Sequence, residues 1–315
     1  MSAAAKPRPT NQRATSALPP AVPGAHAAMF DAFAVHLASR PAHTRTAYLR
    51  DVAQLLVIAG DVPMAKLTRP VLMRFVAVLH GRGLSGRSLA RMLSAWRAFF
   101  RFMIERDRAI TEDPCAGIKA PKSPRRLPSA LSPDEAARLV AIEGADPLSL
   151  RDRALFELAY SSGLRLAELA GMDVDACDLS GGEARVLGKG GKERIVPVGA
   201  KAREAINHWI GARSACAKPE EPAMFVGRSG RRLSPRAIEQ RLAQWAVRSG
   251  LSRHVHPHML RHSFASHVLQ SSGDLRAVQE MLGHASIAST QVYTHLDFQA
   301  LAKVYDAAHP RAKRK

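Results

Sequence analysis

The chain has 315 residues, of which 46% are hydrophobic, so it has room for two ordinary domains with real cores. Its 46 Lys and Arg residues outnumber its 27 Asp and Glu residues, which gives a formal net charge of +19. This charge favours a polyanionic partner. Nucleic acid is a better candidate than a bilayer, because no apolar run approaches the roughly 20 residues that span one. The three cysteines stand singly, which argues against a disulfide framework or a zinc cluster and suits a reducing compartment.

The first 24 residues are rich in Ala and Pro and contain no acid. Such a start can imitate a transit peptide, but its prolines disfavour an amphipathic helix. It also lacks the continuous apolar stretch of a secretory signal. We expect a disordered tail here.

Residues 25–108 have the pattern of an all-α domain. Four helices are expected, at about 26–39, 44–59, 68–80 and 85–107. Apolar residues recur at three- and four-residue steps in the last of them and should face a core. These residues are Leu89, Leu93, Trp96, Phe100 and Met103.

Polar residues fall largely on the other sides of the second and fourth helices. They are Arg45, Thr46, Arg50, Arg87, Ser88, Arg91 and Ser94, with Arg101 nearby. In so basic a chain the first seven are candidates for contacts with nucleic-acid phosphates. The alternative is a solvated face, because arginine stripes often have no other role.

Residues 109–130 contain four prolines and several basic residues, which predicts a semi-extended basic linker between two domains. A single-domain alternative would need a structureless connection of about 20 residues, which is uncommon. We expect the second domain over residues 131–309, followed by a basic tail at 310–315.

The second domain opens at Ser132, a predicted N-cap with Pro133 after it and Glu135 completing a capping box. Gly163 predicts a turn, after which a further helix begins. Other helices are expected at about 150–161, 200–211, 234–249, 257–271, 274–282, 286–294 and 297–308. Three short strands are expected at 174–179, 183–187 and 194–198, with a glycine-rich hairpin turn at 188–192. The domain should therefore be mainly α, with a small three-stranded antiparallel sheet.

Several side chains of this domain are candidates for a phosphoryl-transfer site. They are Arg165, Lys189, His258, Arg261, His284 and Tyr293. Arginine offers a rigid fork of donors that suits phosphate oxygens, and histidine exchanges protons near neutral pH. A tyrosine hydroxyl can serve as the nucleophile.

Each candidate has a plainer alternative. Arg165 can simply pair with Glu168 three residues on. Lys189 can be solvated on its turn, His284 can cap a helix end, and Tyr293 can be a half-buried anchor. His258 and His262 also have a zinc-ligand spacing, but no cysteine or nearby acid completes such a site.

Four motifs resemble, in order and separation, those of the tyrosine site-specific recombinases, the phage integrase family. They are SGLRLAEL at 162–169, GKGGKERIVP at 188–197, HMLRHSFASH at 258–267, and LGH at 282–284 with Tyr293 nine residues later. Residues 46–51 and 88–94 resemble the SAM-like, four-helix core-binding domain of the same family. The resemblance covers nearly everything after residue 25 and shows no departure at a catalytic position. It implies DNA binding by the first domain and catalysis by the second.

The resemblance also implies a reaction. Tyr293 would attack a scissile DNA phosphate and become joined to the 3′ phosphate, which frees a 5′ hydroxyl. The corresponding hydroxyl of the partner duplex would later attack the phosphotyrosine and release Tyr293. Arg165, Arg261 and His284 would bind the phosphate oxygens. His258 and Lys189 would handle the two protons, and which takes which stays open. Two transesterifications need no metal, ATP or other cofactor, which fits a sequence without a P-loop.

Within the family, residues 273–284 and 293–311 are most similar to a branch that resolves chromosome dimers in the bacterial cytoplasm. Its members act with a second, related recombinase in a heterotetrameric complex on a double-stranded DNA site. Alternatives are a phage or mobile-element integrase, a type IB topoisomerase, a non-catalytic basic DNA-binding protein and, weakest, a metal-dependent nuclease.

The predicted C-terminal helix at 297–308 has one apolar side, formed by Phe298, Leu301, Val304 and Tyr305. By resemblance, such a segment docks on a neighbouring catalytic domain. The alternative is a helix that packs on its own domain.

Overall fold

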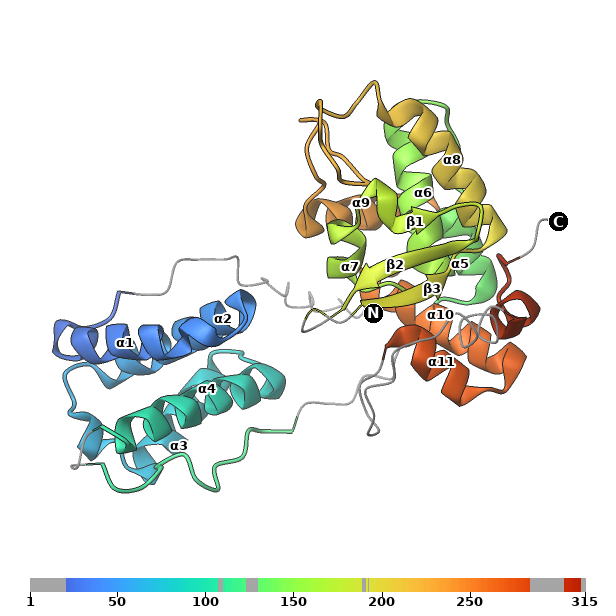
Figure 1. The fold of residues 1–315 in the computed structure, drawn as a ribbon. Coiled ribbons are helices and arrows are strands. Elements are labelled where there is room, and N and C mark those ends of the chain that lie inside the picture. Colours follow the sequence, from blue (N-terminus) through green and yellow to red (C-terminus); the bar gives the residue numbers. More distant parts are fainter. Residues whose placement is uncertain are drawn as a thin grey trace, which may run out of the picture. The chain divides into compact units, whose positions relative to one another are not determined.

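The structure is a computed structural model, and it divides into two compact units, Met1–Arg125 and Arg126–Lys315 (Figure 1). Each unit has its own hydrophobic core. The residues described are 21–106, 110–122, 130–188, 191, 193–283 and 303–312. Within these ranges, no helix is both long and apolar enough to cross a membrane. Of the predicted tail at 1–24, residues 1–20 lie outside the described residues, and Gly24 already begins the first helix.

The first unit is helical, as its sequence predicted. Its elements are α1 (Gly24–His36), η1 (Leu37–Ser39), α2 (Ala42–Ala59), η2 (Met64–Lys66), α3 (Arg69–Gly81) and α4 (Gly86–Ile104). All five apolar residues predicted for the inner side of α4 are buried, and Trp96 is fully enclosed. Its indole Nε1 donates to the carbonyl oxygen of Asp51 at 2.9 Å, which fixes α4 against α2. Helical periodicity thus identified the core of this unit.

Part of the predicted linker packs on the first unit. Ile110, Cys115 and Ile118 are buried in its core. The Arg97 guanidinium on α4 donates through Nη2 to the carbonyl oxygen of Ile118 at 2.6 Å. Residues 110–118 are therefore held against the helices, and residues 123–129 lie outside the described residues.

The second unit is mainly helical, with one small sheet. Its helices are α5 (Pro133–Val140), α6 (Pro147–Ser161), α7 (Leu166–Gly171), α8 (Ala200–Arg213), α9 (Pro235–Arg248), α10 (Pro257–Ser272) and α11 (Leu275–Leu282). The predicted capping box is confirmed, because Ser132 Oγ accepts from the Glu135 N–H and Glu135 Oε2 accepts from the Ser132 N–H. Residues 303–308 are helical. The helix predicted at 286–294 and the start of the one at 297–308 lie outside the described residues.

The sheet contains β1 (Cys177–Asp178), β2 (Glu183–Leu187) and β3 (Glu193–Pro197), all antiparallel in that order. The strand predicted at 174–179 is wrong in its first half, where η3 (Val174–Ala176) forms a 3-10 turn. The Val174 N–H donates to the carbonyl of Pro222 and the Ala176 N–H to that of Asp173. Because these two N–H groups donate outside the sheet, only Cys177 and Asp178 of the segment pair with β2.

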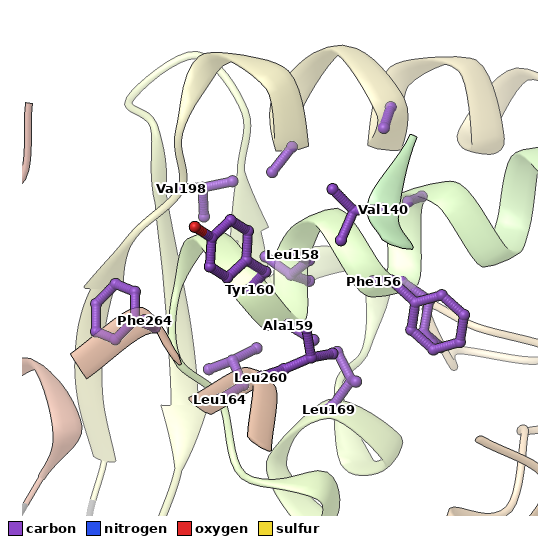
Figure 2. Packing of buried hydrophobic residues seen from close by; sticks show 14 of the residues in the cluster. Val140, Phe156, Leu158, Ala159, Tyr160, Leu164, Leu169, Val198, Leu260 and Phe264 are labelled. Carbon is purple, nitrogen blue, oxygen red and sulfur yellow. The ribbon is translucent and has the colours of Figure 1, made fainter. Parts of the chain in front are cut away.

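The core of the second unit surrounds α6. Figure 2 shows Tyr160, Leu164, Leu260 and Phe264 gathered beside this helix, and all four are buried. Gly163 follows α6 with φ of +58°, and a Cβ built on it would lie 2.4 Å from Phe264 Cδ1. Only glycine permits this backbone and this close approach. The turn at Gly163 places Arg165 at the N-cap of α7.

Replacing Gly163 with Ala is expected to lower the free energy of unfolding by about 2–4 kcal/mol, because the methyl group overlaps a buried ring and the left-handed backbone becomes strained. The control is Gly171→Ala, at the end of α7, where an added Cβ meets nothing within 4 Å. It should change the free energy of unfolding by less than about 1 kcal/mol. Urea unfolding of both variants measures the difference, and equal losses would contradict the packing argument.

Candidate active site

Arg165 and Arg261 meet at the C-terminal end of α11. Arg165 Nη2 donates to the carbonyl oxygen of Gly283 at 3.1 Å, and Arg261 Nη2 donates to that of Leu282 at 2.5 Å. Arg261 Nη1 also donates to the carbonyl oxygen of Gly163 at 2.6 Å. Carbonyls at a helix end lack intrahelical partners and carry partial negative charge. The two guanidiniums satisfy them and are held side by side.

The two arginines differ in exposure. The Arg165 side chain is 33% exposed, whereas Arg261 is 8% exposed. Burial, followed by the charge of Arg165, lowers the pKa of Arg261 to about 10. Arg261 therefore stays positive at neutral pH, next to a second positive charge. Two neighbouring positive charges, one of them partly exposed to solvent, favour the binding of an anion.

The plain alternative for Arg165 also holds, because its Nη1 donates to Glu168 Oε1 at 2.8 Å. Glu168 serves more than Arg165, however. Arg194 Nη1 and Nη2 donate to its two carboxylate oxygens at 2.7 and 2.9 Å. We call Arg165, Arg194, Arg261 and Glu168 the arginine cluster.

Arg194 is a member of this cluster that the sequence did not single out as a site residue. It occupies an inward position of β3, alternating with the buried Val196, and is itself 8% exposed. A charged residue at an inward strand position needs a buried partner. A charged residue at an inward strand position was therefore the signal that the sequence offered. In the structure the buried partner is Glu168.

Glu168 has a pKa of about 2. Its burial raises the pKa, but hydrogen bonds from Arg194 and from the backbone and side chain of Arg165, together with the charge of Arg194, outweigh this effect. The carboxylate is thus ionised throughout the physiological range and cannot act as a proton donor.

Acid is expected to remove the stabilisation that Glu168 provides. The folded pKa of about 2 lies below the unfolded value of about 4.3, so the contribution is complete above about pH 5 and is lost as pH falls towards 2. It amounts to about 3 kcal/mol at neutral pH. Glu168→Gln should therefore flatten the dependence of the unfolding free energy on pH between 5 and 2, as measured by urea unfolding. Glu143→Gln removes an exposed carboxylate as the control, and an equal flattening there would contradict the assignment.

His258 lies on the first turn of α10, on the same helix as Arg261, and its side chain is exposed. Its ring centre lies 6.3 Å from that of His256. Within the described ranges, no three His, Cys, Asp or Glu side chains are placed to hold a metal ion. His267 has a structural role, because its ring nitrogens contact the Tyr160 hydroxyl and the carbonyl of Leu131, at 2.9 and 3.0 Å.

Lys189, His284 and Tyr293 lie outside the described residues. The chain that leads to His284 is nevertheless placed, because Gly283 ends α11 with a φ of +61°. A Cβ built at Gly283 would lie 3.0 Å from Cδ of Arg194. Residue 283 thus lies against the arginine cluster, and a larger side chain there would push into it.

In the first unit most of the polar candidates have intramolecular partners. Arg91 forms an ion pair with the buried carboxylate of Asp51, and Arg50 Nε lies 3.7 Å from the same group. Thr46 and Ser94 each donate to a carbonyl of their own helix, and the Ser88 hydroxyl lies 3.1 Å from that of Ser85. Arg45 is half-buried and Arg87 is exposed. Arg91 is therefore a structural residue as well as a surface one.

A hollow between α2 and α4 contains the candidate Ser94 and adds Arg40, Tyr48 and Arg97, which the sequence did not single out. Its lining consists of Arg40, Thr44, Tyr48, Ser94, Arg97, Ala98 and Arg101. Three of these residues are arginines, and three others carry hydroxyl groups. The hollow has the chemistry of a phosphate-binding surface.

The described part of the predicted C-terminal helix packs on its own domain. Tyr305 is 1% exposed, and its hydroxyl lies 2.7 Å from Ser161 Oγ on α6. Arg311 forms an ion pair with the buried Glu157 of the same helix. For residues 303–312 the structure therefore has the arrangement in which the segment packs on its own domain, because these polar groups find their partners within the chain. Phe298 and Leu301 lie outside the described residues.

Comparison with known proteins decides the family. Residues 30–107 match the "Phage integrase, N-terminal SAM-like domain", and residues 129–300 match the "Phage integrase family". The chain is 54% identical over 293 residues to Tyrosine recombinase XerC of Pseudomonas aeruginosa, covering 90% of this chain and 95% of that protein. The chain belongs to the phage integrase family. Its motifs predicted this family and, within it, the XerC branch.

Other members of the phage integrase family agree. Tyrosine recombinase XerC of Xanthomonas campestris pv. campestris is 50% identical over 319 residues, covering 99% of this chain and 98% of that protein. The structure of XerH site-specific recombinase bound to palindromic difH substrate has a TM-score of 0.65 at 23% identity, covering 84% and 78% of the two chains. A lambda integrase dimer bound to a COC′ core site has a TM-score of 0.67 at 20% identity, covering 84% and 98%. These two structures confirm the expected fold, a SAM-like helical domain with a mainly α domain that carries a small sheet.

Proposed function

We propose that this chain is a XerC-like site-specific recombinase that cuts and rejoins DNA through a 3′-phosphotyrosine intermediate at Tyr293. The observation that carries the proposal is the convergence of Arg165 and Arg261 at the end of α11. From that end the chain leads directly to His284 and then, nine residues later, to Tyr293. In the sequence, Tyr293 thus follows within ten residues the helix end that both arginines contact.

The phosphate is bound by charge. As Tyr293 attacks, negative charge accumulates on the non-bridging oxygens of the scissile phosphate. Arg165 and Arg261 stabilise it with charge-assisted, two-bond contacts, and His284 adds another donor. Ion pairs with Glu168 hold Arg165 and Arg194 in place, so little reorganisation of the arginine cluster is needed during the reaction.

Two protons must move. A tyrosine hydroxyl in water has a pKa near 10, so the Tyr293 nucleophile must be helped to lose its proton, and the departing 5′ oxygen must gain one. His258 and Lys189 are the two groups assigned to these transfers, an effect typically worth about 10²–10⁴-fold each. The exposed position of His258 on α10 leaves it free to meet a bound duplex.

The reaction needs neither metal nor ATP in this proposal. Each step exchanges one phosphodiester bond for another, so no energy input is required. The guanidiniums supply the positive charge that a metal ion supplies in other phosphoryl-transfer enzymes.

We assign DNA binding in the first unit to the candidates on α2 and α4, and add the hollow lined by Arg40, Arg97 and Arg101. The full candidate set is Arg45, Thr46, Arg50, Arg87, Ser88, Arg91 and Ser94 with those three. The net charge of +19 supports phosphate contacts as the main source of affinity.

The biological role that fits this branch is resolution of chromosome dimers in the bacterial cytoplasm, in a heterotetrameric complex with a XerD-like recombinase on a double-stranded DNA site. The identity of 54% to a XerC protein over most of both chains supports this role over that of a mobile-element integrase. In that complex the segment at 297–308 would dock on a neighbouring subunit.

The test is to trap the covalent intermediate. The protein is incubated in EDTA with duplexes that carry its recombination site and a nick beside the cleavage position, so that the freed fragment diffuses away. A protein–DNA adduct resistant to denaturant is expected. Its absence in EDTA but presence with Mg²⁺ would indicate a metal mechanism, and its absence in both would overturn the proposal. Relaxation of supercoils without exchange between two sites would instead indicate a topoisomerase.

A further inference from the structure

Arg194 connects separate elements of the catalytic domain. Its guanidinium gives two parallel hydrogen bonds to Glu168 at the start of α7, at 2.7 and 2.9 Å. Its Nε faces the carbonyl oxygen of Met281 near the end of α11, at 3.4 Å. Because Arg194 itself belongs to β3, one side chain joins β3, α7 and α11. Both of its Nη atoms donate to Glu168, so its guanidinium is directed at this carboxylate and not at a substrate.

Arg194 also changes the charge that Arg165 presents. Among the described residues of the arginine cluster, the guanidiniums of Arg165 and Arg194 both pair with the carboxylate of Glu168, and Arg261 interacts with it only through charge. Without Arg194, this buried carboxylate would pair with Arg165 alone and offset its positive charge. Arg194 therefore leaves Arg165 free to act on an anion, in a site where burial strengthens each charge.

The position of Arg194 on β3 matters as well. It pairs in register with Val186 of β2, so it lies near the base of the hairpin whose turn carries Lys189. Its Cδ lies 3.0 Å from the place where a Cβ at Gly283 would be, and Gly283 leads directly to His284. The side chain that holds Glu168 thus also lies against Gly283, the residue before His284, and belongs to a strand of the hairpin.

We propose that Arg194 is a positioning residue for DNA cleavage, which neutralises Glu168 so that Arg165 keeps its full charge and which holds the hairpin against the end of α11. The inference rests on the proposed function, in which Arg165 binds the scissile phosphate. It adds a seventh residue to the six that the motifs identify, one that acts through its neighbours and not on the substrate.

This role is tested by the rate of adduct formation in a single turnover. The protein is in excess over the DNA, at a concentration that saturates binding. Arg194→Met should slow adduct formation about 10²-fold, the scale of a small misplacement in an active site. Arg194→Lys should regain part of the rate. Adding Glu168→Gln to Arg194→Met should also restore part of it, because the carboxylate that offsets Arg165 is gone. A double variant slower than either single variant would overturn the inference.

A neutral substrate distinguishes the electrostatic effect of Arg194 from its effect on the positions of neighbouring residues. With a methylphosphonate at the scissile position, the loss caused by Arg194→Met should shrink, because an uncharged phosphorus centre needs less positive charge. An equal loss on both substrates would overturn the electrostatic role. The control is Arg185→Met, on β2 of the same sheet with an exposed side chain, whose rate should stay within about 3-fold of wild type. Failure of the wild-type protein to form any adduct would refute the proposed function instead of this inference.

Discussion

Tyr293→Phe is expected to abolish the protein–DNA adduct while leaving DNA binding unchanged. The substitution removes only the phenolic oxygen, the atom that would form the bond to phosphorus. Neither the arginine cluster nor the polar surface of the first unit is altered. Gel shift at several salt concentrations measures binding, and denaturing electrophoresis after incubation with the nicked duplex measures cleavage.

The matched control for that variant is Tyr48→Phe, which removes a hydroxyl from the hollow between α2 and α4. This variant should retain the adduct and can lose some DNA affinity. An undiminished adduct with Tyr293→Phe would remove Tyr293 from the mechanism.

Arg261→Ala should reduce the rate of adduct formation by about 10²–10³-fold, the usual effect of removing one donor to a developing negative charge. It also leaves the carbonyls of Gly163 and Leu282 without their guanidinium partner. Each buried carbonyl without a partner costs about 1–3 kcal/mol, so the free energy of unfolding should fall as well. The rate loss must therefore be measured where the variant is still folded, with thermal unfolding as the check.

Arg261→Lys distinguishes charge from geometry. A lysine keeps the positive charge but lacks the planar fork that reaches both carbonyls and a phosphate oxygen. It should recover part of the rate lost in Arg261→Ala. Arg276→Ala, which removes an 83% exposed side chain from α11, should leave the rate unchanged. A similar loss in Arg276→Ala and Arg261→Ala would show that the rate depends on general positive charge near α11 and not on the position of Arg261.

Local patterns predicted much of the fold. The stripe of α4 that contains Leu89 and Trp96 is buried as its period required, and the capping box at Ser132 begins α5. Both depend on residues within one or two helical turns. The start of the strand predicted at 174–179 was wrong because the Val174 N–H donates to Pro222, far along the chain. A contact of that range leaves no periodic signal.

The site was predictable in its residue types but not in its connections. Motifs identified Arg165 and Arg261, yet their convergence on the end of α11 depends on tertiary packing around Gly163. Arg194 was missed because an arginine in a short strand resembles a surface residue until its partner Glu168 is placed. The partners of Tyr305 and Arg311 on α6 were missed for the same reason.

Mapping the covalent bond tests the central claim most directly. The adduct from the nicked duplex is digested with nuclease and protease, and mass spectrometry locates the remaining nucleotide on the peptide. We predict a nucleotide attached through its 3′ phosphate to Tyr293. Attachment to any other residue, or through a 5′ phosphate, would contradict the account.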